Sequence, residues 1–114
     1  MTLLAVGCGG AAGAVSRYAV TLALDRRGLD VLAVNVAGSF ALGVVLGAGL
    51  EGPAGLALGV GFCGAFTTFS SFAVETVRLA EDGEPIAAAA YAGGTLSLAL
   101  LAVGAGGLVG AVLW

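Results

Sequence analysis

The middle of the chain reads Gly61-Phe62-Cys63-Gly64-Ala65-Phe66-Thr67-Thr68-Phe69-Ser70-Ser71-Phe72. These twelve residues include four hydroxyl side chains and four phenylalanines, and they lie near the midpoint of a mostly apolar segment, residues 53–79. A helix that faced only lipid would carry few hydroxyl groups at that depth, because polar groups in hydrocarbon are costly unless they find partners. We therefore expect this segment to do more than cross a membrane.

The composition excludes an ordinary soluble domain. Of the 114 residues, 60% are hydrophobic and 10% are charged, and the mean hydropathy is +1.11. A soluble domain carries about 25% charged residues, so these charges cannot cover a water-facing surface. The sequence predicts an all-α membrane protein.

Four predominantly apolar segments follow one another along the chain, and each is long enough to cross a bilayer as a helix, for which about 20 residues suffice. They are residues 2–24, 31–50, 53–79 and 85–113, which we interpret as a single four-helix transmembrane domain over 1–114. The connectors are short, so successive helices should run antiparallel. Pro53 and Pro85 fit first helical turns, where a missing amide is harmless. No basic segment precedes the first span, which we expect to be retained rather than cleaved.

The polar inventory argues against an enzyme. The chain has no histidine and two cysteines, so neither a histidine-activated nucleophile nor a four-ligand zinc site can be assembled within it. The net charge of −3 and the absence of a basic run argue against nucleic acid as a partner.

Glycines recur four residues apart in four pairs. Such pairs let helix backbones approach closely where no hydrophobic effect drives packing. We expect tight helix contacts at Gly9 with Gly13, Gly43 with Gly47, Gly55 with Gly59, and Gly106 with Gly110.

Gly64 beside the hydroxyl residues permits two interpretations of the central segment. In the first, the helix breaks at mid-membrane and the freed carbonyls become hard oxygen ligands suited to an alkali cation. In the second, the helix is continuous and its hydroxyls bond back to the preceding turn. Composition alone does not separate the two.

The aromatic residues are equally ambiguous. Phe66, Phe69 and Phe72 recur at a spacing of three, so on a resumed helix they project from about the same side. Such a stripe usually packs against a neighbouring helix. The positive edge of each ring also attracts an anion without a formal positive charge.

Three further polar features have structural and functional interpretations. Asn35 either donates its amide to an anion or joins two spans by a cross-helix hydrogen bond. Arg17 lies about 10 Å from the end of its helix, and it either snorkels to the interface or lines a water-filled vestibule. Glu75 and Arg78 are three residues apart, which favours an interfacial ion pair.

Three motifs together resemble the CrcB/Fluc fluoride channels. They are Gly9-Gly10-Ala11-Ala12-Gly13-Ala14-Val15-Ser16-Arg17-Tyr18, Val34-Asn35-Val36-Ala37-Gly38-Ser39-Phe40 and the twelve central residues that end at Phe72. The third motif is highly specific, and the fourth segment fits by its length and by Tyr91.

The resemblance implies a channel that exports cytoplasmic fluoride passively across a prokaryotic cell membrane. Its four-helix protomers would pair as an antiparallel, dual-topology dimer, with the third helix broken at mid-membrane and a structural sodium ion at the dimer centre. By motif, the backbone carbonyls of Gly64 and Thr67 would hold the sodium. The implied fluoride-pore residues are Asn35, Phe69, Phe72, Ser70, Ser71, Tyr91, Arg17 and Glu75.

The chain departs from the family pattern at three positions. Fluoride channels often have Thr where this chain has Val31, Thr where it has Ser71, and Ser where it has Ala73. The track of hydroxyl groups is therefore thinner, which bears on conduction rate and halide handling more than on the fold.

Two alternative functions fit the four spans. A small proton-coupled multidrug transporter shares the length and the antiparallel dimer, but it needs a carboxylate within its first span, where this chain has Arg17 and no acid. A structural subunit of a larger membrane complex is the other. A fluoride-sensitivity assay in cells that lack their own exporter separates all three.

The basic residues of the connectors are unevenly distributed. Arg26, Arg27 and Arg78 lie on one side of the predicted membrane and none lie opposite, which by the positive-inside rule directs the first and third connectors to the cytoplasm. A homodimer of antiparallel protomers should be nearly unbiased. The partner is thus either a second copy or a paralogue of opposite orientation.

Overall fold

The computed structural model describes residues 1–24, 26 and 28–113, and within them every regular element is helical. The elements are α1 (Thr2–Ala23), α2 (Leu29–Gly47), α3 (Gly52–Leu56), the π-helical η1 (Ala57–Cys63), α4 (Gly64–Phe66), α5 (Phe69–Glu81) and α6 (Pro85–Leu113). Four segments are long and apolar enough to cross a membrane: Thr2–Ala23, Leu29–Gly47, Gly52–Glu81 and Pro85–Leu113. The prediction of an all-helical protein with four candidate membrane-spanning helices is confirmed.

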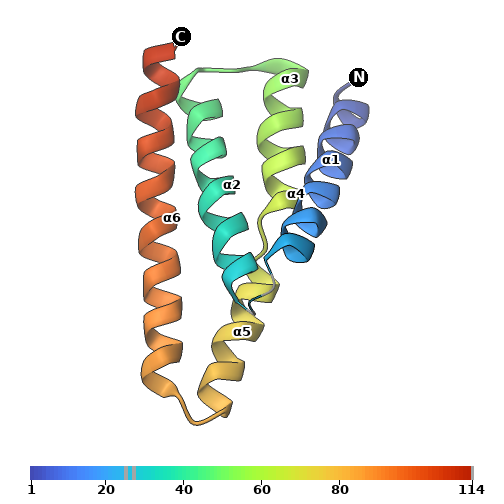
Figure 1. The fold of residues 1–114 in the computed structure, drawn as a ribbon. Coiled ribbons are helices and arrows are strands. Elements are labelled where there is room, and N and C mark those ends of the chain that lie inside the picture. The colour runs from blue at the N-terminus through green and yellow to red at the C-terminus, as the bar shows by residue number, and fades with distance from the viewer. Residues whose placement is uncertain (25, 27, 114) are drawn as a thin grey trace.

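The helices pack in two layers that the third segment joins (Figure 1). The long helix α6 lies along α2, and α1 lies along α3, η1 and α4. Beyond Phe66 the chain leans across, so that α5 packs against α6 instead of α1. The two halves of the third segment therefore have different neighbours. Both termini lie at the same end, as an even number of crossings requires.

The closest contacts between helices occur at glycine residues, which have no side chain to keep the backbones apart. A Cβ atom on Gly43 or Gly47 of α2 would collide with backbone atoms of α6, and one on Gly106 or Gly110 of α6 would collide with backbone atoms of α2. The same holds between α1 and the third segment, where Gly9 and Gly13 face the carbonyls of Ala57 and Phe62. Three of the four predicted pairs are therefore helix contacts.

The fourth pair behaves differently. A Cβ atom on Gly55 would collide with the carbonyl of Leu50 in the adjoining connector, and one on Gly59 would meet side chains of α2 at 3.7 Å or more. Gly59 therefore makes no close backbone contact with another helix, because η1 is covered on that side by Leu42 and Val45.

We expect Gly106→Ala to destabilise the protein and Gly104→Ala to leave it unchanged or slightly more stable. The added methyl at position 106 collides with the Phe40 carbonyl, whereas position 104 has open space within 4 Å. Overpacking of this kind costs about 1–3 kcal/mol, against a gain in helix propensity of about 0.5–1 kcal/mol that both variants share. Thermal unfolding of the purified protein in detergent measures the difference. Equal melting temperatures would contradict the close contact of α2 with α6.

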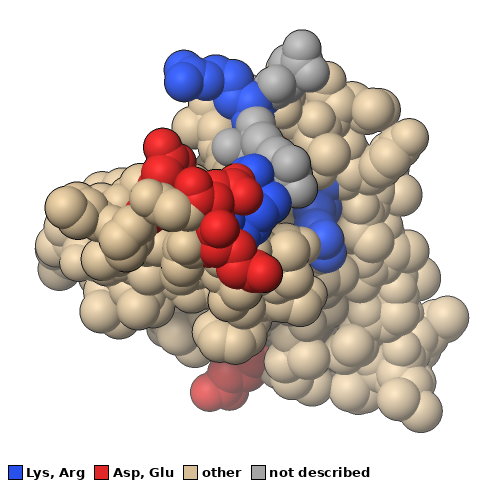
Figure 2. All heavy atoms as spheres, turned by 90° about the horizontal axis from the view of Figure 1, so that it is seen from below, with Lys and Arg blue, Asp and Glu red and all other residues tan. Residues whose placement is uncertain are grey.

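The outer surface is apolar, and most of the charges gather at one end. Many large apolar side chains face outward, among them Leu3, Ile86 and Leu101, which suits a lipid environment and not water. Figure 2 shows acidic and basic side chains side by side around the end of the molecule seen from below. Together with the four apolar helices, this distribution is that of a multi-pass membrane protein.

Candidate functional site

The helical backbone of the third segment is interrupted at two residues. Thr67 (φ −84°, ψ 164°) and Thr68 (φ −150°, ψ 121°) are extended, between the end of α4 at Phe66 and the start of α5 at Phe69. Thr68 then caps α5, because its Oγ1 accepts a hydrogen bond of 3.2 Å from the amide of Ser71. These two residues reorient the chain from α1 toward α6.

Gly64 is not where the interruption occurs. Its backbone (φ −62°, ψ −37°) is that of an ordinary right-handed helix, and the extended residues begin three positions later. A Cβ atom on Gly64 would meet nothing within 4 Å. The extended conformation is therefore adopted by Thr67 and Thr68 and not by Gly64.

The interruption leaves backbone carbonyls unpaired. The amide and the hydroxyl of Thr67 both donate to the carbonyl of Cys63, at 3.1 and 2.9 Å. Among the residues that the structure describes, no hydrogen bond reaches the carbonyl oxygen of Gly64 or of Thr67. Both oxygens are therefore available as hard ligands, which is the donor type that an alkali cation prefers.

Asn35 holds the interruption from a neighbouring helix. Its amide nitrogen donates to the carbonyl of Thr68 at 3.0 Å, and its amide oxygen accepts from the amide of Thr68 at 2.8 Å. The side chain thus supplies to Thr68 the two bonds that a broken helix cannot supply. Of the two interpretations of Asn35, the structure has the cross-helix bond.

A pocket of about 310 Å³ opens beside the interruption. Its wall brings together predicted site residues from α2, α4, the interruption and α5: Asn35, Gly64, Thr67, Phe69 and Phe72. The remainder of the wall is mostly apolar, with Leu42 from α2 and Leu96 from α6. The pocket therefore has an apolar surface with polar groups at the backbone of the interruption.

The phenylalanines separate into two pairs. Phe66 stacks on Phe62 with ring centroids 5.4 Å apart, whereas Phe69 and Phe72 are 5.9 Å apart beyond the interruption. The prediction that Phe66 continues the stripe of Phe69 and Phe72 is wrong, because the backbone changes direction between them. Phe72 is buried and stacks in turn on Tyr91 of α6, and Phe69 is 79% exposed.

A second pocket, of about 460 Å³, lies at the charged end of the molecule. It is lined by Ser70, Ser71 and Glu75 of α5 and by Arg26 and Asp30 near the start of α2. Arg17 donates from α1 to the Ser71 hydroxyl at 3.3 Å. Of the two interpretations of Arg17, this contact favours a side chain that turns toward the pocket lining.

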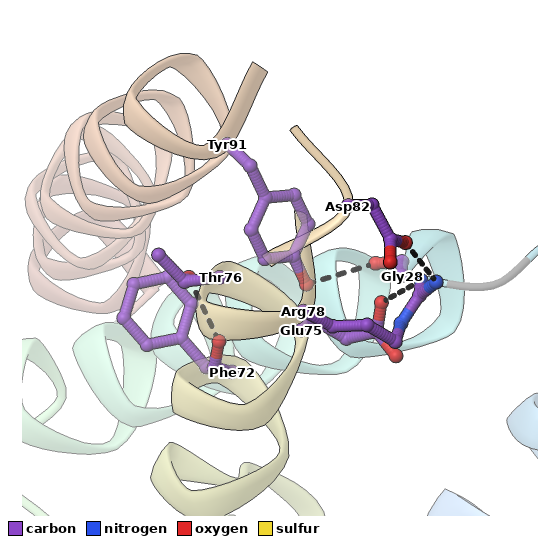
Figure 3. Close-up of polar contacts among 7 residues, drawn as sticks. All are labelled: Gly28, Phe72, Glu75, Thr76, Arg78, Asp82 and Tyr91. Carbon is purple, nitrogen blue, oxygen red and sulfur yellow. Dashed lines mark hydrogen bonds and ion pairs between the residues drawn. The ribbon is translucent and has the colours of Figure 1, made fainter. Parts of the chain in front are cut away.

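Charged and aromatic groups meet beside this second pocket (Figure 3). Arg78 pairs with Glu75 at 2.6 Å and with Asp82 at 3.5 Å, which confirms the predicted ion pair. The Tyr91 hydroxyl donates to the carbonyl of Gly28 at 3.1 Å. Gly28 adopts a left-handed backbone (φ 88°), and a Cβ there would lie within 3.6 Å of the Tyr91 ring and the Glu75 carboxylate. These contacts join α5 and α6 to the start of α2.

A family model described as "CrcB-like protein, Camphor Resistance (CrcB)" matches residues 4–111. The chain belongs to this family. It is similar to the fluoride-specific ion channel FluC 2 of Natronomonas pharaonis, with 63% identity over 99% of this chain and 97% of the relative. Identity to FluC 2 of Haloarcula marismortui is 52%, over 87% and 85% of the two chains. Identity to FluC of Chlorobaculum tepidum is 43%, over 98% and 95%.

Two residues of this CrcB-like chain belong to the site although the sequence did not single them out. Thr95 of α6 lines the first pocket, and within the described residues its buried hydroxyl has no hydrogen-bond partner. Gly38 of α2 is buried against the interruption, where a Cβ would collide with the Thr67 side chain. Their positions relative to predicted residues were the available signals: Thr95 is four residues after Tyr91, and Gly38 is three after Asn35.

Two of the three departures from the CrcB/Fluc pattern line the second pocket. Val31 is buried and lines the second pocket together with Ser71. Ala73 lies between Phe72 and Val74 on α5. The thinner hydroxyl track therefore concerns the second pocket more than the first.

Proposed function

We propose that this chain forms a passive fluoride channel and that the anion passes along α5 beside the interruption. The observation that carries the proposal is the grouping of Asn35, Phe69 and Phe72 around one pocket next to the extended Thr67 and Thr68. Membership of the CrcB-like family and the names of the relatives support it. The protein is accordingly an ion channel and not an enzyme.

The first turn of α5 connects the two pockets. Phe69 and Phe72 line the apolar pocket, and Ser70 and Ser71 between them line the charged one. Fluoride holds its water strongly, so a selective path must replace that water with hydrogen-bond donors and with the positive edges of aromatic rings. The serine hydroxyls and the two phenylalanine rings lie within one turn of α5, and the Arg17 guanidinium reaches Ser71 from α1.

The third span is proposed to be broken at mid-membrane. A second protomer is proposed to complete the pathway beside this break. Phe69 is 79% exposed within one chain, although an aromatic side chain in a conduction pathway needs a covered surface. A second four-helix protomer, inserted antiparallel, would cover it and would bring two interruptions together at the centre. Tyr91, Arg17 and Glu75 would then lie at or near the mouth of each pore.

The unpaired carbonyls fit a structural sodium ion at this centre. The carbonyl oxygens of Gly64 and Thr67 from both protomers would hold it, since neither oxygen has a donor among the described residues. A bound sodium ion would supply positive charge that neutralises these carbonyl dipoles where no water reaches them.

The partner is proposed to be a second copy or a paralogue. Arg26 lines the pocket at the charged end and Arg78 pairs with Glu75 there, whereas Arg27, the third basic connector residue, lies outside the described residues. By the positive-inside rule, the excess of arginine in these connectors favours an orientation in which this end faces the cytoplasm. The membrane itself is proposed to be the cell membrane of a prokaryote, where export of fluoride protects the cytoplasm.

The multidrug-transporter alternative is not favoured. The first span, Thr2–Ala23, contains Arg17 and no carboxylate, so it lacks the group that would carry a proton there. The structural-subunit alternative has no feature in its support beyond the four helices.

Reconstitution of the purified protein into liposomes loaded with potassium fluoride tests the proposal. When a potassium ionophore sets the membrane potential, we expect fluoride efflux at an electrode, and no chloride efflux from liposomes loaded with potassium chloride. Flux from this chain alone supports a homodimer. Flux only after reconstitution with a paralogue supports a heterodimer, and no fluoride flux in either case would reject the channel.

A further inference from the structure

The Glu75 carboxylate lies on the route proposed for an anion. It lines the charged pocket together with Ser70 and Ser71, and its side chain is only 12% exposed. A unit negative charge about 4 Å from the path lowers local anion occupancy about fivefold even with the screening of bulk water, and by more where water is excluded. A fluoride pathway therefore needs this charge to be balanced.

Arg78 is placed to balance it. It lies one turn after Glu75 on α5, and its Nη2 is 2.6 Å from Glu75 Oε2 (Figure 3). Its second contact, with Asp82, is 3.5 Å long and involves a carboxylate that is 57% exposed. Because solvent screens exposed pairs strongly, Glu75 is the main electrostatic partner of Arg78.

The arginine side chain is also held in place. Its Nε is buried and has no hydrogen-bond partner within the described residues, so the guanidinium is oriented by its two terminal nitrogens. Among the described residues, other charged or titratable groups near Glu75 include Arg26 and Asp30, which line the same pocket, and Tyr91 of α6. Arg78 is thus one of several groups around Glu75, and it makes a short contact of 2.6 Å with that carboxylate.

We infer that Arg78 determines the anion conductance of this channel by cancelling the Glu75 charge beside Ser70 and Ser71. The inference rests on the proposed fluoride channel and adds a residue that sets its rate. Arg78 does not itself line the pocket, so it acts through Glu75 as a positioning and charge-balancing residue.

Fluoride efflux from liposomes tests this role with three variants. Arg78→Gln should lower the initial rate per folded protein at least about fivefold at low salt. Arg78→Gln combined with Glu75→Gln should recover most of that loss, because the Glu75 carboxylate is then no longer present to repel the anion. Asp82→Asn is the matched control and should match the wild type, since that carboxylate contacts the same arginine but does not line the pocket.

A merely structural ion pair would behave differently. If Arg78 only stabilised the end of α5, the double variant would conduct no better than Arg78→Gln. Salt gives a second readout, because raising ionic strength from about 0.01 to 1 M shortens the screening length from about 30 to 3 Å. The deficit of Arg78→Gln should shrink over this range, and a deficit independent of salt would overturn the inference.

The same measurements distinguish a misfolded variant from a failure of the role of Arg78 and from a failure of the proposed channel. Rates are normalised to monodisperse protein, and if Arg78→Gln does not fold, Arg78→Met tests the same loss of charge with more apolar packing. Wild-type flux together with an unaffected Arg78→Gln or Arg78→Met variant overturns the role of Arg78 and leaves the channel intact. Absence of wild-type flux overturns the channel and this inference with it.

Discussion

Asn35→Asp is expected to abolish fluoride efflux and to destabilise the protein. The substitution keeps the shape of the side chain but replaces the amide donor with an oxygen that faces the carbonyl of Thr68, 3.0 Å away in the wild type. An unsatisfied buried backbone carbonyl costs about 1–3 kcal/mol, and more when a charge opposes it. The extended conformation of Thr67 and Thr68 should then no longer be held.

The stability measurement separates a clamp from an anion ligand. Thermal unfolding in detergent without fluoride should show a lower melting temperature for Asn35→Asp, whereas loss of an anion ligand alone would leave that temperature unchanged. Ser39→Ala is the control for stability, because Ser39 lines the same pocket one turn later. A variant that keeps both wild-type stability and wild-type flux would reject the clamp.

Phe69→Ile and Phe72→Ile are each expected to reduce fluoride efflux to background. Isoleucine keeps the apolar volume but has no positive ring edge to replace the water of the anion. The two variants should differ in stability, because Phe69 is largely exposed whereas Phe72 is buried against Tyr91. We expect Phe69→Ile to unfold like the wild type and Phe72→Ile to lose about 1–2 kcal/mol through the lost stacking and the poorer fit.

The matched control is Phe40→Ile. Phe40 is an aromatic side chain of α2 that is 40% exposed, and it does not line either pocket described above. Efflux should be unchanged in this variant. Full fluoride flux in Phe69→Ile or Phe72→Ile would remove the aromatic residues from the mechanism.

The number and approximate positions of the helices follow from the sequence because lipid imposes a simple rule. A long apolar segment without charges must satisfy its backbone internally, and a helix does this. The glycine contacts at Gly43, Gly106 and their partners were also predictable, since close approach requires the absence of a side chain. The places of Pro53 in the first turn of α3 and of Pro85 at the start of α6 followed from the missing amide of proline.

The conformation of the central segment was not predictable in the same way. Gly64 was the obvious candidate for a break because glycine is the most permissive residue, yet it is helical and the threonines are extended. The decisive partner is Asn35, which is distant in sequence, and local propensity contains no information about it. The separation of Phe66 from Phe69 and Phe72 depends on the same change of direction and was missed for the same reason.

The pockets depended on tertiary packing as well. Ser70, Ser71 and Glu75 were expected to belong to the pathway through the family resemblance, but their common lining with Arg26 and Asp30 required the structure. Thr95 was overlooked because a lone threonine in an apolar helix resembles many others. Its unpartnered buried hydroxyl became visible only when α6 was placed against the pocket.

The two bonds from Asn35 to Thr68 connect positions 33 residues apart. Information for the kinked path of one helix is therefore stored partly in another helix. If residues 53–81 were transplanted into an unrelated bundle with no amide group at that depth, they would straighten into one continuous rod. The central motif is thus not a portable module, and any redesign of this region has to carry both segments together.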